Sequence, residues 1–191
     1  MPPTQAMKAD FRVCLDACVL ANFGVADLLL RLAERPRQYL PIWSAEILNE
    51  VHRTQREQLD WPEHLADSFR DELRAHFPEA RTSGFEHLIE HLKNDPKDRH
   101  VLAAAIQARA ELILTFNLKD FPEEALSPWG IDARHPQEYL LTLYEMDPLQ
   151  IVSRISAIAT ERERDQQEVL IQLGQSVPAF STRLLSDLNL S

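Results

Sequence analysis

Glycine and cysteine are scarce in this sequence of 191 residues, which holds 4 glycines and 2 cysteines beside 12 prolines. Glycine supplies most backbone positions with positive φ, so its scarcity favours a helix-rich fold. Cys14 and Cys18 lie in one short apolar stretch, which excludes the disulfide framework of a small secreted domain. We therefore expect the protein to work in a reducing compartment.

Long hydrophobic runs are also missing. The stretch Val25–Leu32 is interrupted by Asp27 and Arg31, whereas a membrane helix needs about 20 apolar residues in succession. This pattern predicts no membrane-spanning segment and no membrane partner. The first ten residues lack the apolar segment of a signal peptide, so a cytoplasmic location is expected.

Positive charge is in deficit, since 20 Lys and Arg stand against 30 Asp and Glu for a formal net charge of −10. The field of the whole molecule repels polyanions, so a nucleic acid would need a local basic patch. The hydrophobic fraction of 45% is typical of a globular protein. A chain of this length buries roughly 70% of its unfolded surface, which is enough for one domain with an appendage.

The first half of the chain alternates between strand and helix patterns. Residues 11–15 form a short apolar run that Asp16 closes, and residues 19–32 carry apolar side chains at helical spacing. A second strand is expected over residues 39–43, followed by a helix that Ser44 caps. Two or three helices are expected between Trp61 and Leu92.

The second half continues the pattern and then becomes helical. Asp95 and Pro96 predict the start of a helix, residues 112–115 and 131–133 predict strands, and a helix begins at Pro136. Strands separated by helices indicate an α/β fold with a parallel sheet covered on both faces. Residues 146–191 are predicted to be helical with a break at 174–178, and the charged run 161–165 reads as a solvated helix face. We therefore divide the chain into a domain over 8–145 and a helical extension over 146–191.

Polar side chains follow the predicted strands, where an open parallel sheet binds its ligands. Asp16 ends the first strand, Asn117 and Asp120 follow the strand at 112–115, and the remaining candidates, Asp98 and Glu50, lie on neighbouring helices. Clustered carboxylates need a cation, and hard oxygen ligands suit Mg²⁺ or Mn²⁺. The pattern indicates metal-assisted phosphoryl chemistry. Read singly, Asp98 also suits the first turn of any helix, and Glu50 also suits pairing with Arg53.

Four stretches carry a resemblance to a known family: Val13–Leu20, Trp43–Val51, Asp95–Ala105 and Leu114–Pro122. Taken in order, they make the sequence similar to the PIN-domain nucleases, and within these to the VapC-like toxins of type II toxin–antitoxin pairs. The resemblance implies a three-layer α/β/α domain with a central parallel sheet. It also implies an endoribonuclease that depends on Mg²⁺ or Mn²⁺ and acts on RNA.

The same resemblance assigns roles to individual residues. The family's first three acids fall on Asp16, Glu50 and Asp98, which would hold the metal. The fourth position, commonly aspartate, is Asn117 here, which lowers the negative charge of the site, and Asp120 lies close enough to compensate. Thr115 would orient a water or a phosphate.

The resemblance further implies partners. These are RNA, with transfer RNA among the candidates, and a cognate antitoxin protein that blocks the cleft with a cationic side chain. Dimers are common in the family, so a homodimer is one of the states it allows.

Three alternatives stay open. His87 and His91 flank an H-x-x-E-H pattern that some zinc hydrolases use. Asp16 after the first strand also suits an aspartyl-nucleophile phosphomonoesterase, although Cys18 stands where the general acid would be. Finally, Asn117 favours a PIN-like module that binds RNA or a protein without cutting.

Overall fold

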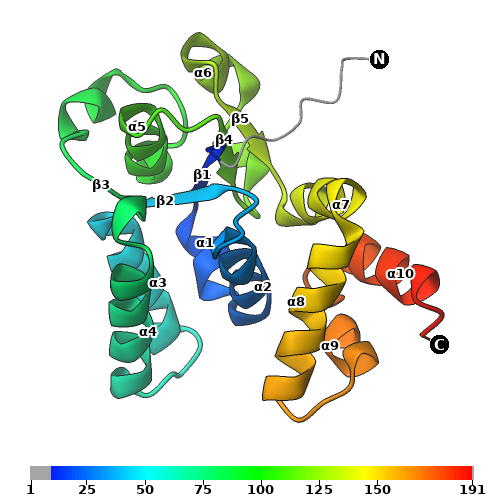
Figure 1. The fold of residues 1–191 in the computed structure, drawn as a ribbon. Helices are drawn as coiled ribbons and strands as arrows, with labels where there is room; N and C mark the ends of the chain where they lie inside the picture. The colour runs from blue at the N-terminus through cyan, green and yellow to red at the C-terminus, as the bar shows by residue number, and fades with distance from the viewer. Residues whose placement is uncertain (1–9, 191) are drawn as a thin grey trace, which may run out of the picture.

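A five-stranded parallel sheet forms the centre of the molecule, and the computed structural model describes residues 10–190 of the chain (Figure 1). Residues 8, 9 and 191 of the two predicted units lie outside the described residues. The strands stand in the order β3-β2-β1-β4-β5. They are β1 (Arg12–Leu15), β2 (Leu40–Ser44), β3 (Arg81–Thr82), β4 (Leu112–Leu114) and β5 (Asp132–Arg134).

The first strand lies in the middle of the sheet and marks the point where the strand order reverses. In β1, Cys14 is in register with Ile42 of β2 on one side and with Ile113 of β4 on the other. The chain moves outward from β1 to β2 and β3, then returns to build β4 and β5 on the opposite side. In open α/β sheets such a reversal opens a crevice at the carboxyl ends of the strands.

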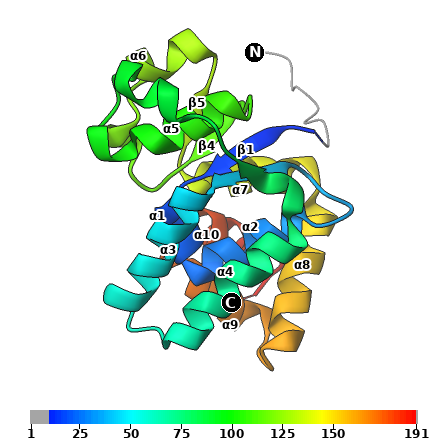
Figure 2. The same cartoon turned by 90° about the vertical axis from the view of Figure 1, so that its left-hand side faces the viewer.

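Helices cover both faces of the sheet. Their bounds are α1 (Ala17–Ala21), α2 (Phe23–Ala33), α3 (Ala45–Glu57), α4 (Glu63–His76), α5 (Arg99–Gln107), α6 (Glu123–Leu126) and α7 (Pro136–Met146). The helices α5 and α6 lie on one face, and α1, α2 and α7 lie on the other (Figures 1 and 2). The helix α3 packs against α1, and α4 packs against α3. The predicted three-layer α/β/α fold is confirmed.

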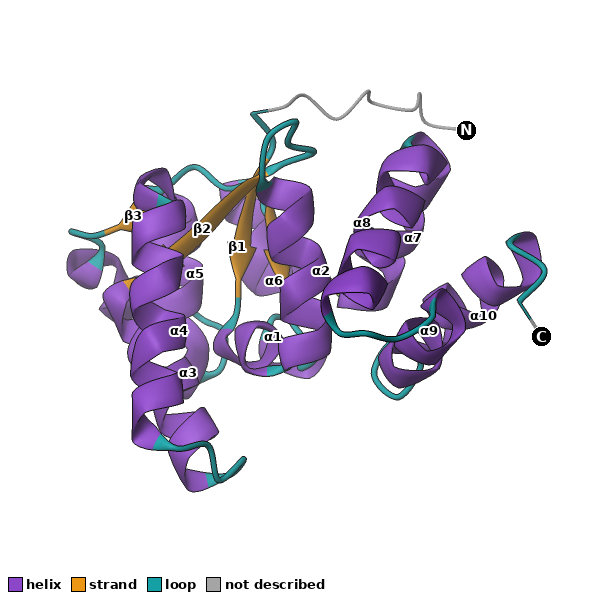
Figure 3. Cartoon of the chain, turned by 60° about the horizontal axis from the view of Figure 1, so that its bottom comes forward, coloured by secondary structure: helices purple, strands orange, loops and turns teal. Residues whose placement is uncertain are grey.

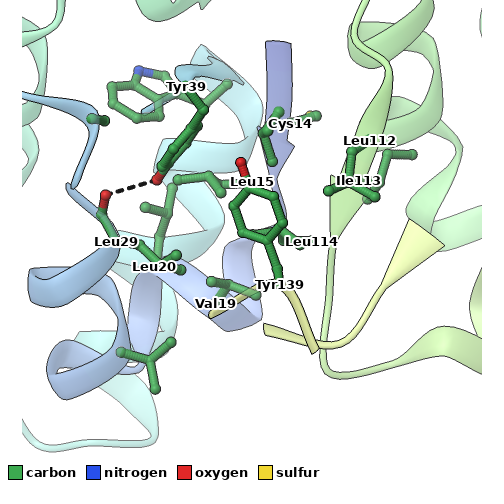
Figure 4. Packing of buried hydrophobic residues seen from close by; sticks show 14 of the residues in the cluster. Cys14, Leu15, Val19, Leu20, Leu29, Tyr39, Leu112, Ile113, Leu114 and Tyr139 are labelled. Atoms are coloured by element: carbon green, nitrogen blue, oxygen red, sulfur yellow. Dashed lines mark hydrogen bonds between the residues drawn. The ribbon is translucent and has the colours of Figure 1, made fainter. Parts of the chain in front are cut away.

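The core lies between the central strands and the helices beside them (Figure 4). Val13, Cys14 and Leu15 are completely buried, because a parallel strand covered on both faces has no solvent side. The buried Tyr39 donates its hydroxyl proton to the carbonyl oxygen of Leu29 at 2.8 Å. Each large apolar side chain buried here contributes roughly 1.5–3 kcal/mol to stability.

Three further helices follow the last strand and α7, and they pack on the helices at one side of the sheet (Figure 3). They are α8 (Pro148–Glu161), α9 (Gln166–Leu173) and α10 (Pro178–Asp187). The helices α8 and α9 contact α2, while α8 and α10 contact α7. The predicted break at 174–178 is confirmed, since α9 ends at Leu173 and α10 begins at Pro178.

Ion pairs link the end of α8 and the turn after it to α2. Asp27 pairs with Arg31 one turn later and with Arg162, and Arg31 also pairs with Glu161. The interpretation of residues 161–165 as a solvated helix face is right about their exposure, apart from Arg162, and wrong about the helix. Glu161 ends α8, the next residues form a turn, and the side chain of Asp165 caps α9 by accepting from the backbone N–H of Glu168.

Two other local predictions need correction. The helix expected over 19–32 is two helices, because the backbone leaves the helical conformation at Asn22, whose side chain caps α2 by accepting from the N–H of Val25. The region 61–92 holds α4, two short 3₁₀ turns and the strand β3, which the sequence did not reveal. Among the described residues, every helix is too short or too polar to span a bilayer.

Candidate active site

Asp16 stands at the carboxyl end of β1, beside the end of β4. Its backbone N–H donates to the carbonyl oxygen of Leu114 at 3.0 Å, which continues the pairing of the two strands. Asp16 is buried, with 4% of the residue exposed. Its Oδ1 accepts from the N–H of Ala17 at 2.6 Å. Oδ2 accepts from the hydroxyl of Thr115 at 2.7 Å and from the thiol of Cys18 at 3.1 Å. These contacts fix the orientation of the carboxylate.

Thr115 links this carboxylate to the turn after β4. The residue is completely buried, and its hydroxyl oxygen accepts from the N–H of Asn117 at 3.0 Å while donating to Asp16. Both of its hydrogen-bonding directions thus have protein partners. The role expected for Thr115 in orienting a water or phosphate stays a prediction, and the hydroxyl holds Asp16 in this structure.

Asp98 faces Asp16 from the turn that precedes α5. Asp95 accepts from the N–H of Lys97 and so caps a 3₁₀ turn over Pro96–Asp98, and α5 begins one residue later than this turn ends. Burial first, and the negative charge of Asp16 second, raise the pKa of Asp98 to about 6. Its Oδ2 atom is buried and has no hydrogen-bond partner among residues 10–190. A carboxylate oxygen in that situation is costly unless a cation reaches it.

Asp120 adds a third carboxylate. It is buried at the end of a short 3₁₀ turn, and its charge also raises the pKa of Asp98. The ammonium of Lys97 lies 3.3 Å from Oδ2 of Asp120 and 3.8 Å from Oδ2 of Asp98. Asn117, by contrast, is exposed and lies directly before this turn. The structure therefore brings Asp16, Asp98 and Asp120 into one electrostatic group.

Glu50 lies on α3 and is held against α5. Its Oε2 atom is 3.1 Å from Nε2 of His100, and its Oε1 atom is 3.7 Å from the guanidinium of Arg53. Burial alone would lower the pKa of His100, but the hydrogen bond and charge of Glu50 outweigh it and raise the pKa. The sequence analysis missed His100, because its partner lies fifty positions away on another helix.

The acids fit a hard divalent cation. The donor atoms are all oxygens, and the buried Oδ2 of Asp98 accepts no hydrogen bond from the described residues. Within residues 10–190, no group of three or more Asp, Glu, His or Cys side chains is arranged so that together they could hold a metal ion. Mg²⁺ is usually bound by one or two carboxylates with several retained waters, so an incomplete protein shell suits it.

The competing zinc site finds no support in the geometry. His87 and His91 lie on a 3₁₀ turn over Glu86–His91 rather than on an α-helix. With three residues per turn, side chains four apart point about 120° away from each other.

The cysteines do not provide metal ligands either. Burial raises the pKa of Cys14, and burial together with the charge of Asp16 raises the pKa of Cys18 to about 12. Within residues 10–190, neither thiol belongs to a group of three or more side chains that could hold a metal ion.

Basic and aromatic side chains lie near the acids in the sequence. Three lysines among them are exposed: Lys93, Lys97 and Lys119. Basic residues that bind a polyanion must be exposed in this way. The ring of Phe116 is partly buried and meets the imidazole of His135 edge-on at 5.0 Å. Trp43 is 1% exposed and packs on Phe77, so it fills the core and does not reach a ligand.

Comparison with known proteins agrees with this geometry. A family model described as the PIN domain matches residues 10–119. Over 103 residues the chain is 40% identical to the Mycobacterium tuberculosis protein named "Putative ribonuclease VapC50". That match covers 52% of this chain and 61% of the relative, so it spans about three fifths of the relative's length. No solved structure matches the chain at a significant level.

Proposed function

Since the chain belongs to the PIN-domain family, we propose that it is a Mg²⁺- or Mn²⁺-dependent endoribonuclease that hydrolyses phosphodiester bonds of RNA. The observation that carries this proposal is the buried Oδ2 of Asp98, which accepts no hydrogen bond from residues 10–190 and lies beside the charges of Asp16 and Asp120. Three acids at the reversal point of a parallel sheet, one with a buried oxygen that accepts no hydrogen bond, suit a divalent cation beside the ammonium of Lys97.

Each acid has a distinct part in this proposal. Asp16 and Asp98 would hold the metal, with Asp16 kept in place by Ala17 and Thr115. Glu50, Asp120 and Asn117 would complete the shell directly or through water. A bound divalent cation would supply a water of lowered pKa and would neutralise charge on the phosphodiester. All of these residues lie within the proposed nuclease unit over 8–145, which leaves 146–191 as an extension.

The relative's printed name supports RNA as the substrate. We extend the proposal to a toxin whose antitoxin places a cationic side chain among the acids. Lys97 already lies within 3.8 Å of Asp98 and Asp120, so the site accommodates an ammonium group. A structured RNA such as transfer RNA is the proposed target class, and a homodimer is compatible with the proposal.

Cleavage of a mixed RNA pool tests the proposal. The parent and Asp16→Asn would be incubated with Mn²⁺, with Mg²⁺ and with EDTA. We expect cleavage by the parent only when metal is present, and a loss of about 100-fold or more in Asp16→Asn, because a metal ligand and its support are removed together. Asp132→Asn is the matched control, since Asp132 is 69% exposed on the edge strand β5. Full activity of Asp16→Asn would refute the assignment.

The exposed Asn117 in place of a fourth acid favours a second candidate, a PIN-fold module that binds RNA or a protein without cutting. Binding of the RNA pool without cleavage in either metal would support this module.

A further inference from the structure

His100 is a buried imidazole whose two nitrogens both face acceptor atoms. Its side chain is 6% exposed. Nδ1 lies 2.9 Å from the carbonyl oxygen of Lys97, and Nε2 lies 3.1 Å from Oε2 of Glu50. Carbonyl and carboxylate oxygens only accept hydrogen bonds, and the tautomer that carries its proton on Nε2 donates to Glu50. His100 thus spans two separate parts of the structure.

The two parts that His100 joins are those that carry Asp98 and Glu50. Lys97 belongs to the 3₁₀ turn that ends at Asp98, whereas Glu50 belongs to α3. Apart from this imidazole, Glu50 meets Arg53, whose side chain is 61% exposed and whose guanidinium is 3.7 Å away. A contact of that kind, exposed and long, orients a carboxylate weakly. The buried hydrogen bond from His100 is therefore the stronger constraint on Glu50.

We propose that His100 is a positioning residue for the metal site: its Nε2–H holds Oε2 of Glu50 on α3 beside the turn that carries Asp98, so that Glu50 can bind the cation directly or through water. This inference rests on the proposed function. Groups that orient a metal-binding carboxylate are typically worth a factor of about 10–100 in metal affinity. The site would then depend on a residue that does not touch the metal.

Two substitutions distinguish the role of Nδ1 from the role of Nε2 in His100. The amide of glutamine reaches the place of Nε2 and the amide of asparagine the place of Nδ1, since the side chains differ by one methylene. His100→Gln keeps a donor for Glu50, and His100→Asn keeps a donor for Lys97. We expect Mn²⁺ affinity, measured by calorimetry on the full chain, to fall about 10–100-fold in His100→Asn and to stay within about threefold of the parent in His100→Gln.

His52 provides a matched control. It lies on α3 and its Nε2 is also 3.1 Å from a carboxylate, that of Asp67, away from the acids of the site. His52→Asn should leave Mn²⁺ affinity unchanged. In a Glu50→Gln background, His100→Asn should have no further effect, because the group it positions is gone. Equal losses in the two His100 variants, or a loss that persists in the Glu50→Gln background, would overturn the inference.

A measurement on the parent alone covers the case in which His100→Asn does not fold. The ring ¹⁵N signals of His100 should move when Mg²⁺ is added, and they should stay fixed in Glu50→Gln and for His52. Unmoved His100 signals in a parent that binds Mg²⁺ would refute the positioning role. Failure of the proposed function looks different, since the parent would then bind no metal or would bind it equally well in Asp16→Asn.

Discussion

Replacing Asp98 by asparagine should stabilise the metal-free protein although it abolishes cleavage. Burial and the charge of Asp16 raise the pKa of Asp98 from 3.8 to about 6, so the folded state disfavours the ionised form. At one pKa unit per 1.36 kcal/mol, this rise corresponds to about 3 kcal/mol. The carboxyl is partly open to water, and solvent screening reduces the figure to about 1 kcal/mol.

The sign and pH window follow from the direction of the shift. Because the folded pKa lies above the unfolded value, the penalty is fully present above about pH 6, shrinks as the pH falls, and is absent below 3.8. Asparagine carries no charge and avoids the penalty. We therefore expect Asp98→Asn to unfold about 2–4 °C higher than the parent at about pH 8, with no difference at about pH 4.

Urea and thermal unfolding in EDTA, followed by circular dichroism across this pH range, measure the effect. Asp132→Asn serves as the control because Asp132 is an exposed acid on the sheet edge, and it should change stability little at any pH. Added Mn²⁺ should stabilise the parent and not Asp98→Asn. A variant less stable than the parent at about pH 8, or a gain that persists at about pH 4, would refute the reasoning.

Three further predictions concern the core, the C-terminal helices and the thiols. Ile113→Ala should lower the free energy of unfolding by about 2–5 kcal/mol, because Ile113 is completely buried in β4; a loss below about 1 kcal/mol in urea titration would contradict this packing. Arg162→Ala removes the ion pair to Asp27 and the cation above the ring of Phe23, so stability should drop by about 1 kcal/mol and limited proteolysis should cut residues 148–187 faster. A thiol reagent at about pH 8 should label neither cysteine in the folded protein and both in urea, since burial raises both pKa values; rapid labelling of the native protein would argue against the buried position of Cys18.

The sequence predicted every strand of the sheet except β3, and it predicted the end of β1, because those signals are local. A run of apolar residues closed by Asp16 specifies a buried strand with an acid at its carboxyl end. The break at Asn22 was missed because the apolar spacing of α1 and α2 continues across it. The pattern at 86–91 suits an α-helix and a 3₁₀ turn alike, and tertiary contacts decide between them.

Within the site, the sequence could name the acids but not their partners. Asp98 and Asp120 each follow a recognisable structural signal, a helix start and a strand end. The hydrogen bond between His100 and Glu50 depends on how α3 and α5 approach each other, and no spacing in the chain encodes that approach. The assignment of all six residues as site residues stays a prediction: Asp16, Glu50, Asp98, Thr115, Asn117 and Asp120.

The placement of β1 between β2 and β4 also governs when the site can exist during synthesis. A ribosome releases the chain from its N-terminus at roughly 5–20 residues per second. Asp16 emerges early, but its partner strand β4 ends at Leu114 and Asp120 lies beyond it. A growing chain thus carries the first acid for several seconds before the other two can join it. A cell that makes this protein meets an assembled centre only after more than half of the chain has been translated.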